Sequence, residues 1–113
     1  MSDSAWKVFD LNTLLEKVEG SEPCFHEFLR MPGLSSAVYR LPAGAKDMQA
    51  PHLEDEVYFV VEGKAQLRVD GQEHKVRPGS ILYVRATADH SFFDVEEDLT
   101  LLAFFGPTKP LWR

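Results

Sequence analysis

Two segments of the sequence carry an imidazole and a carboxylate at spacings that suit metal binding. His52 and Glu56 lie four residues apart at the start of a predicted strand. Because side chains alternate along a strand, both point to the same side. On a later predicted strand, His90, Phe92 and Asp94 also share one face. Two imidazoles and a carboxylate that meet inside a barrel bind one side of a divalent metal ion and leave positions open for substrate or water. The alternative for His52 and Glu56 is a polar pair at a barrel rim, hydrogen-bonded to the backbone.

The composition of the chain excludes several other kinds of site. Its 113 residues carry 12 Lys and Arg against 18 Asp and Glu, a net charge of −6, whereas binding to nucleic-acid phosphates needs a concentrated basic face. The single cysteine, Cys24, cannot close an intramolecular disulfide or build a cysteine-rich zinc or iron–sulfur site. No apolar run is long enough to span a membrane, and no secretory signal is visible. We therefore expect a cytoplasmic protein with neither a nucleic-acid nor a membrane partner.

The elements that must position these residues form one domain over residues 1–113. Residues 1–22 are the predicted N-terminal helical segment, capped by Asp10, with apolar residues at positions 11, 14, 15 and 18 on one face. Gly20 is expected to end this helix. Residues 107–113 are the predicted C-terminal tail.

Residues 23–106 are predicted to form a β-barrel. Short candidate strands alternate with turns rich in Gly, Pro and acidic residues, and Asp70-Gly71 indicates a tight hairpin. The candidate strands are Cys24–Arg30, Ser36–Leu41, Glu56–Val61, Ala65–Asp70, Gln72–Arg77, Ile81–Val84, His90–Val95 and Leu99–Phe105. This pattern is typical of an all-β sandwich or barrel, and no segment between the strands could be the crossover helix of a parallel sheet.

The sequence resembles the cupin superfamily, whose members are small barrels with two signature motifs. The first motif is matched by Gly44, five residues, Ala50-Pro51-His52, three residues, Glu56, six residues and Gly63. The second is matched by Gly79, five residues, Arg85-Ala86-Thr87, two residues, His90, three residues and Asp94. The resemblance covers Val38 to Phe105. It implies a jelly-roll barrel, also called a double-stranded β-helix.

The resemblance also implies a metal set of His52, Glu56 and His90, binding iron, manganese, nickel or zinc. Ala50 stands where the first motif has another histidine, so one of the usual four ligands is missing. The amide oxygen of Gln49 is a candidate replacement, although on a regular strand residue 49 faces away from residue 52.

Four further residues are pocket candidates: Tyr58, Phe92, Asp94 and His26. For His26 the alternative is a half-buried structural histidine, and we expect His74, beside the predicted hairpin, to be solvated. The resemblance permits dioxygenase, isomerase or lyase chemistry on a small molecule. It also permits a non-enzymatic binding or sensing protein with a weakened or empty metal site, so whether the chain is an enzyme stays open.

Apolar residues near both ends of the chain favour a homodimer. Trp6, Phe9 and the tail residues Pro110-Leu111-Trp112 are difficult to bury within one small barrel. Strand exchange or sheet packing between two barrels would cover them.

Overall fold

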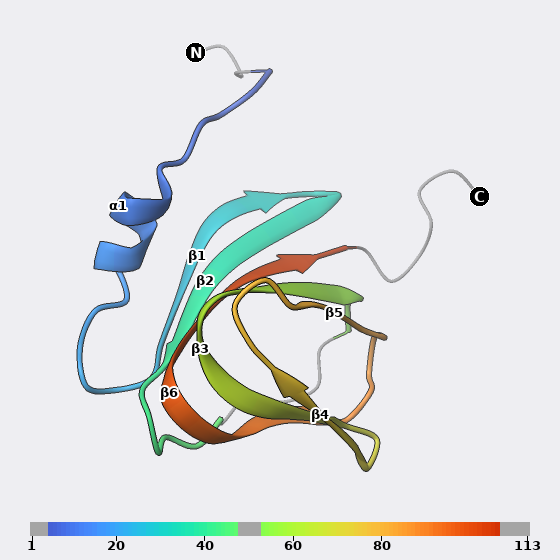
Figure 1. Ribbon diagram of the computed structural model, residues 1–113. Helices are drawn as coiled ribbons and strands as arrows, with labels where there is room; N and C mark the ends of the chain where they lie inside the picture. Colours follow the sequence, from blue (N-terminus) through green and yellow to red (C-terminus); the bar gives the residue numbers. More distant parts are fainter. Residues whose placement is uncertain (1–4, 48–52, 107–113) are drawn as a thin grey trace.

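The computed structural model describes residues 5–47 and 53–106 and confirms an all-β domain with one short helix (Figure 1). Its elements are α1 (Leu11–Glu16), β1 (Cys24–Met31), β2 (Leu34–Leu41), β3 (Glu56–Val69), β4 (Gln72–Val76), β5 (Ile81–Val84) and β6 (His90–Phe105). Within these described ranges, no helix has the length and apolar character that crossing a membrane requires.

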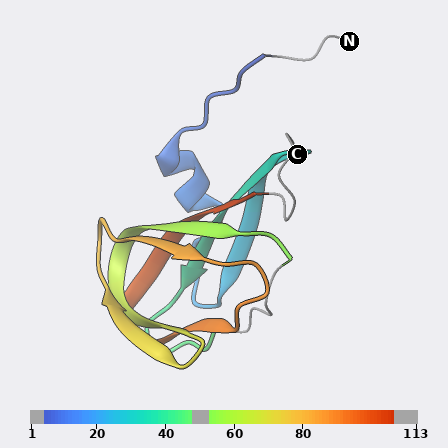
Figure 2. The same ribbon diagram turned by 90° about the vertical axis from the view of Figure 1, so that its right-hand side faces the viewer.

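The strands form one antiparallel sheet that curls into the expected jelly-roll barrel. The sheet order is β1-β2-β6-β3-β4, and β5 pairs with the first half of β3. The two long strands, β3 and β6, pair along almost their whole length, and Figures 1 and 2 show both of them bending around the barrel. β6 pairs with β2 and β3, and β3 also pairs with β4 and β5. The curvature of these two strands therefore decides which residues meet inside the barrel.

The strands β3 and β6 are longer than the sequence predicts. We expected breaks at Glu62-Gly63 and at the acidic residues 96–98, but both strands continue through these positions. The predicted turns are irregularities in the pairing, since the β3–β6 register shifts between Val60 and Gln66. Gly63 has a φ of 99°, and a β-carbon there would collide with the backbone of Asp98 and Leu99. Glycine is therefore required at this bend, because only glycine accepts both the positive φ and the close approach.

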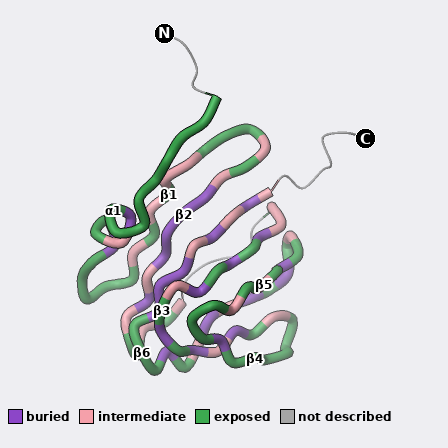
Figure 3. The backbone as a smooth tube through the Cα atoms, turned by 45° about the horizontal axis from the view of Figure 1, so that its top comes forward, coloured by how far each residue is buried: buried purple, intermediate pink, exposed green. Residues whose placement is uncertain are grey.

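The buried apolar side chains form two groups. Figure 3 shows that the buried residues are distributed along the strands. The larger group fills the barrel and includes Tyr39, Tyr58 and Phe92. The smaller group lies outside, where Leu14 and Val18 of the N-terminal segment pack on Val38 of β2. The side chain of Asp10 caps α1 by accepting hydrogen bonds from the backbone N–H groups of residues 12 and 13. The helix thus covers the outer face of the barrel and takes no part in its interior.

Candidate functional site

Glu56 and His90 meet inside the barrel. Glu56 Oε1 lies 3.2 Å from His90 Nε2, and both side chains are only 1% exposed. In the β3–β6 ladder these residues are far apart, because Glu56 is opposite Phe105 and His90 is opposite Val69. On a flat strand the 13 steps from position 56 to position 69 would span about 43 Å. The curling of β3 and β6 therefore creates this contact.

A backbone carbonyl orients the His90 ring. Nδ1 of His90 lies 3.0 Å from the carbonyl oxygen of Ala88, so Nδ1–H is the donor and Nε2 faces the interior. The hydrogen bond with Glu56 raises the pKa of His90; burial opposes this rise, and the Ala88 carbonyl and the charge of Asp47 add to it. Glu56 therefore stabilises the protonated imidazole, and a metal ion binding at Nε2 would have to displace that proton.

Tyr58 lies beside this pair on β3. Its hydroxyl group is 3.2 Å from His90 Nε2, and its ring packs edge-on against Phe92 at a centroid distance of 5.1 Å. The residue is fully buried, and burial followed by the charge of Glu56 raises the pKa of its hydroxyl group far above the usual range. Tyr58 therefore stays protonated and supplies a hydrogen-bond donor to the site.

Asp47 is a member of the site that sequence analysis missed. Its Oδ1 accepts a hydrogen bond of 2.7 Å from the hydroxyl group of Tyr39, and its Oδ2 accepts one of 2.9 Å from the backbone N–H of Phe92. No periodic pattern marks Asp47, because these partners lie 8 and 45 residues away in the chain. Burial and the bond to Asp47 raise the pKa of Tyr39 well above its ordinary value.

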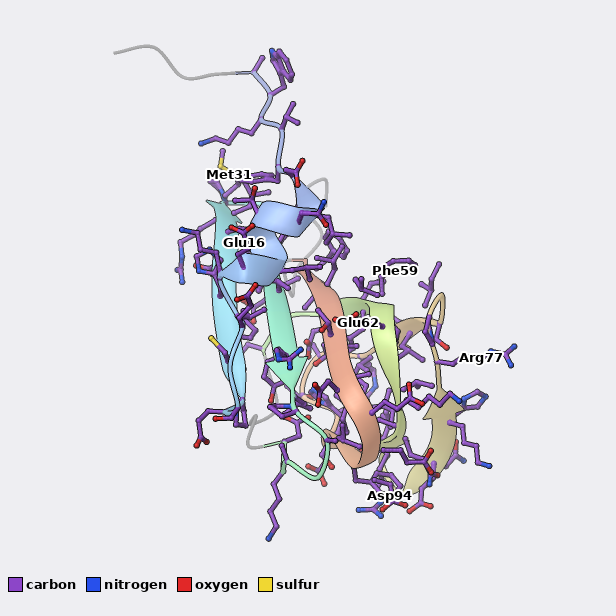
Figure 4. All side chains as sticks on the ribbon, turned by 60° about the vertical axis from the view of Figure 1, so that its left-hand side comes forward. Glu16, Met31, Phe59, Glu62, Arg77 and Asp94 are labelled. Atoms are coloured by element: carbon purple, nitrogen blue, oxygen red, sulfur yellow. The ribbon has the colours of Figure 1, made fainter. Side chains whose placement is uncertain are left out.

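The structure brings four of the predicted site residues together inside the barrel and places Asp94 and His26 away from them. Glu56, Tyr58, His90 and Phe92 are buried in the interior. Asp94 is exposed on the outside (Figure 4), where its Oδ2 accepts a hydrogen bond of 3.2 Å from Gln66. The expected alternation from His90 to Asp94 ends because Asp94 has a φ of 48°, and Val95 is buried in its place. His52 and Gln49 lie outside the described residues.

The other two histidines lie away from the interior. His26 on β1 is opposite Val38, which belongs to the outer apolar group under α1, so its side chain is on that side of the sheet. It is half-buried. His74 on β4 is exposed, as expected, and its Nδ1 lies 2.6 Å from the carbonyl oxygen of Lys75.

The donor atoms of Glu56 and His90 fit a divalent transition metal. A carboxylate oxygen and an imidazole nitrogen face each other in a buried setting, and the second ring nitrogen is held by a backbone carbonyl, as is usual for metal-binding histidines. Residues 5–47 and 53–106 alone contain no group of three or more His, Cys, Asp or Glu side chains that could bind a metal. His52, the third member of the expected ligand set, lies outside these described residues.

Comparisons with known proteins agree with this architecture. A model described as the cupin domain matches residues 37–105. An uncharacterized protein of Streptomyces coelicolor is 40% identical over 103 residues, which cover 91% of this chain and 98% of that protein.

Two solved structures show the same fold. An RmlC-like cupin family protein of Methanocaldococcus jannaschii, with a double-stranded β-helix fold, has a TM-score of 0.75, 15% identity and 94% coverage of each chain. The DMSP lyase DddQ of Ruegeria pomeroyi has a TM-score of 0.71 and 16% identity, with 89% of this chain and 55% of that chain covered.

Proposed function

Because this chain belongs to the cupin domain family, we propose that its barrel binds one divalent transition metal ion through His52, Glu56 and His90. The observation that carries the proposal is the buried 3.2 Å contact between Glu56 Oε1 and His90 Nε2. Two buried ionisable groups in contact are expensive to maintain for stability alone, because their desolvation offsets much of their attraction. A shared metal ion is a reason for a chain to keep them. Iron, manganese, nickel and zinc all suit this combination of ligands.

The ligands would hold the ion so that coordination positions stay open for a small-molecule substrate. When bound, such an ion supplies Lewis-acid activation of a carbonyl or enolate, or a binding position for O₂ next to the substrate. Dioxygenase, isomerase and lyase reactions all use these properties. Around the ion, the Ala88 carbonyl holds the His90 ring in position. The neutral hydroxyl group of Tyr58 lies 3.2 Å from His90 Nε2, and Phe92 packs against the Tyr58 ring.

Metal analysis of the untagged protein tests this proposal. We expect close to one metal ion per chain after growth with the preferred metal, and a large loss in His52→Ala and in His90→Ala. His74→Ala is the matched control, because His74 is exposed on β4 and should not affect metal content. Substoichiometric metal under every growth supplement, or equal losses in all three variants, would contradict the proposal.

Gln49 is proposed as a weaker fourth ligand, acting directly or through water, in place of the histidine that Ala50 replaces. Gln49→Ala should then reduce metal affinity by less than His52→Ala does. An unchanged affinity in Gln49→Ala would remove it from the ligand set.

A non-enzymatic binding or sensing function is the second candidate, and Ala50 is the observation that favours it. An alanine in place of a ligand weakens metal binding, which suits a protein that releases or samples its ligand. O₂ uptake and product formation across a panel of small metabolites distinguish the two functions. Full metal content without any turnover favours sensing, and turnover that disappears in His90→Ala favours catalysis.

We also propose that the chain forms a homodimer. Large apolar side chains are exposed on the N-terminal segment, with Trp6 75% exposed, and on β5, with Ile81 71% and Tyr83 64% exposed. Packing between two barrels would remove this surface from water. Size-exclusion chromatography with light scattering should give twice the mass of the chain, and a stable monomer at micromolar concentration would exclude the dimer.

A further inference from the structure

A group of residues beside the proposed metal ligands lines the inner side of the sheet. It consists of Phe25, Tyr39, Asp47 and Phe105, and we call it the aromatic half. Asp47 joins it to Phe92 through the backbone N–H, and Phe105 joins it to Glu56, its neighbour in the β3–β6 ladder. Both Glu56 and Phe105 are buried. The aromatic half therefore lies directly beside the proposed metal ligands.

The rings of the aromatic half contact one another, and one of them faces solvent. Phe25 packs against Tyr39 at a centroid distance of 5.8 Å and against Phe105 at 6.4 Å. Tyr39 is 4% and Phe105 is 6% exposed, but Phe25 is 43% exposed. Phe25 lies on the edge strand β1 and is opposite Tyr39, so its ring lies on the inner face of the sheet. Phe25 thus presents an exposed ring, backed by the buried rings of Tyr39 and Phe105, on the side of the sheet that carries Glu56.

Asp47 is the carboxylate of the aromatic half, and the neighbouring Glu56 is paired with His90. Asp47 receives hydrogen bonds from Tyr39 and from the Phe92 backbone, and its negative charge contributes to raising the pKa values of Tyr39, Tyr58 and His90. Its field therefore reaches the interior. The face of an aromatic ring also carries partial negative charge and attracts cations. Ring faces and carboxylates together favour a neutral or positively charged group and disfavour an anion.

We propose that the aromatic half binds the non-reacting part of the substrate, and that this part is a flat apolar group, aromatic or conjugated, that is neutral or positively charged. The inference rests on the metal site proposed above, because it assumes that the reacting part of the substrate lies at Glu56 and His90. Phe25 is then a specificity-determining residue, since its exposed ring provides the first stacking surface.

Three probes with the same ring and different charges test this inference: benzylamine, benzyl alcohol and benzoate. Each is titrated into the full-length protein after removal of metal with EDTA, and dissociation constants are taken from NMR chemical-shift changes. We expect benzylamine to bind about tenfold or more tightly than benzoate, with benzyl alcohol between them, because the probes differ in their interaction with Asp47, whereas Glu56 is paired with His90 in the metal-free protein. Benzoate binding as tightly as benzylamine would overturn the inference.

Phe25→Leu and Phe93→Leu provide a matched pair of variants. Phe93 lies on the outer side of β6, with the guanidinium group of Arg68 4.3 Å from its ring centroid. Phe25→Leu should weaken benzylamine binding by about threefold to fivefold, the size of one partly exposed cation–π contact, and Phe93→Leu should have no effect. Equal effects of the two substitutions would overturn the inference. If Phe25→Leu does not fold, Phe25→Tyr keeps the ring and should retain the benzylamine preference.

The probe titrations and the metal analysis can fail independently of each other. A chain that binds no metal but prefers benzylamine contradicts the metal proposal and leaves the aromatic half as a binding surface. A chain that retains metal but shows no preference among the probes contradicts this inference alone.

Discussion

The same kinds of residue occur inside the barrel and on its outer surface, and the structure gives them different roles. At one end of β3, Glu56 pairs with His90, and both side chains are 1% exposed. At the other end, Arg68 pairs with Glu73 of β4 at 2.7 Å, with the two side chains 47% and 45% exposed. Although the exposed contact is the shorter one, water screens its charges, whereas the buried pair is unscreened and carries a desolvation cost.

Histidines and glycines show the same difference. His90 is enclosed by Glu56, Tyr58 and a backbone carbonyl, whereas the exposed His74 has a carbonyl contact only with its neighbour Lys75. Gly63 is surrounded by the backbone of β6, whereas Gly71 in the β3–β4 hairpin has open space where a β-carbon would lie. Burial therefore decides which residue of each type can be replaced, and matched substitutions measure the difference.

The largest difference is expected for metal affinity in Glu56→Gln and Glu73→Gln. Structural zinc sites with four ligands bind with about 10–16 kcal/mol, or roughly 2.5–4 kcal/mol per ligand, so the loss of Glu56 should weaken binding by about a hundredfold to a thousandfold. Glu73→Gln should leave affinity unchanged. Competition with a chelator of known affinity measures both, and equal affinities would show that the interior is not the metal site.

The next difference is expected for stability in Gly63→Ala and Gly71→Ala. Both glycines have positive φ, 99° and 84°, so each substitution strains the backbone by roughly 1–2 kcal/mol. At Gly63 the new methyl group also collides with the backbone of Asp98 and Leu99, which adds a cost of similar size, for a total of about 3 kcal/mol. Urea denaturation measures both free energies. Losses of the same size at the two positions would mean that β6 moves aside without difficulty.

A smaller effect, which depends on pH, is expected for Tyr39→Phe. At pH 7 the variant loses the hydrogen bond to Asp47, at a cost of about 1 kcal/mol. Burial, followed by that bond, raises the pKa of Tyr39 above the value of about 10 that it has in the unfolded chain. The folded state therefore favours the neutral hydroxyl group, and this stabilisation is present below pH 10 and is lost as pH rises above 10.

The wild-type protein should accordingly lose its advantage over Tyr39→Phe as the pH rises above about 10. Free energies of unfolding from denaturant titrations at pH 7, 9 and 11 measure the difference. A difference that stays constant over this range would show that Tyr39 ionises in the folded protein as easily as in the unfolded chain.

The smallest effect on the free energy of unfolding is expected for Arg68→Ala on the outer surface. Its exposed pair with Glu73 contributes less than about 1 kcal/mol, and the cation–π contact with Phe93 contributes a similar amount. Because salt screens exposed charges, the difference from wild type should shrink in 1 M salt. If Arg68→Ala lowered the free energy of unfolding by several kcal/mol independently of salt, the outer surface would not differ from the barrel interior in this respect.

Much of the fold could be predicted from local sequence signals. The helix capped by Asp10, the Asp70-Gly71 hairpin and most strand positions depend on neighbouring residues, and the structure confirms them. The helix ends at Glu16, however, and not at Gly20 as expected. The predicted breaks in β3 and β6 were wrong, because Gly63 and the acidic residues 96–98 have the composition of turns. A bulge and a turn use the same residue types, and long-range pairing decides between them.

For the site, the sequence by itself determined the family motifs and the positions of Glu56 and His90, because motif spacing is a property of the chain. The curvature of the sheet decided the rest. It brought Glu56 to His90 across the barrel, and it placed Asp47 between Tyr39 and Phe92. The bulge at Asp94 moved that carboxylate to the outer surface. Each of these outcomes depends on how residues distant in sequence pack together, and no alternation along a single strand contains that information.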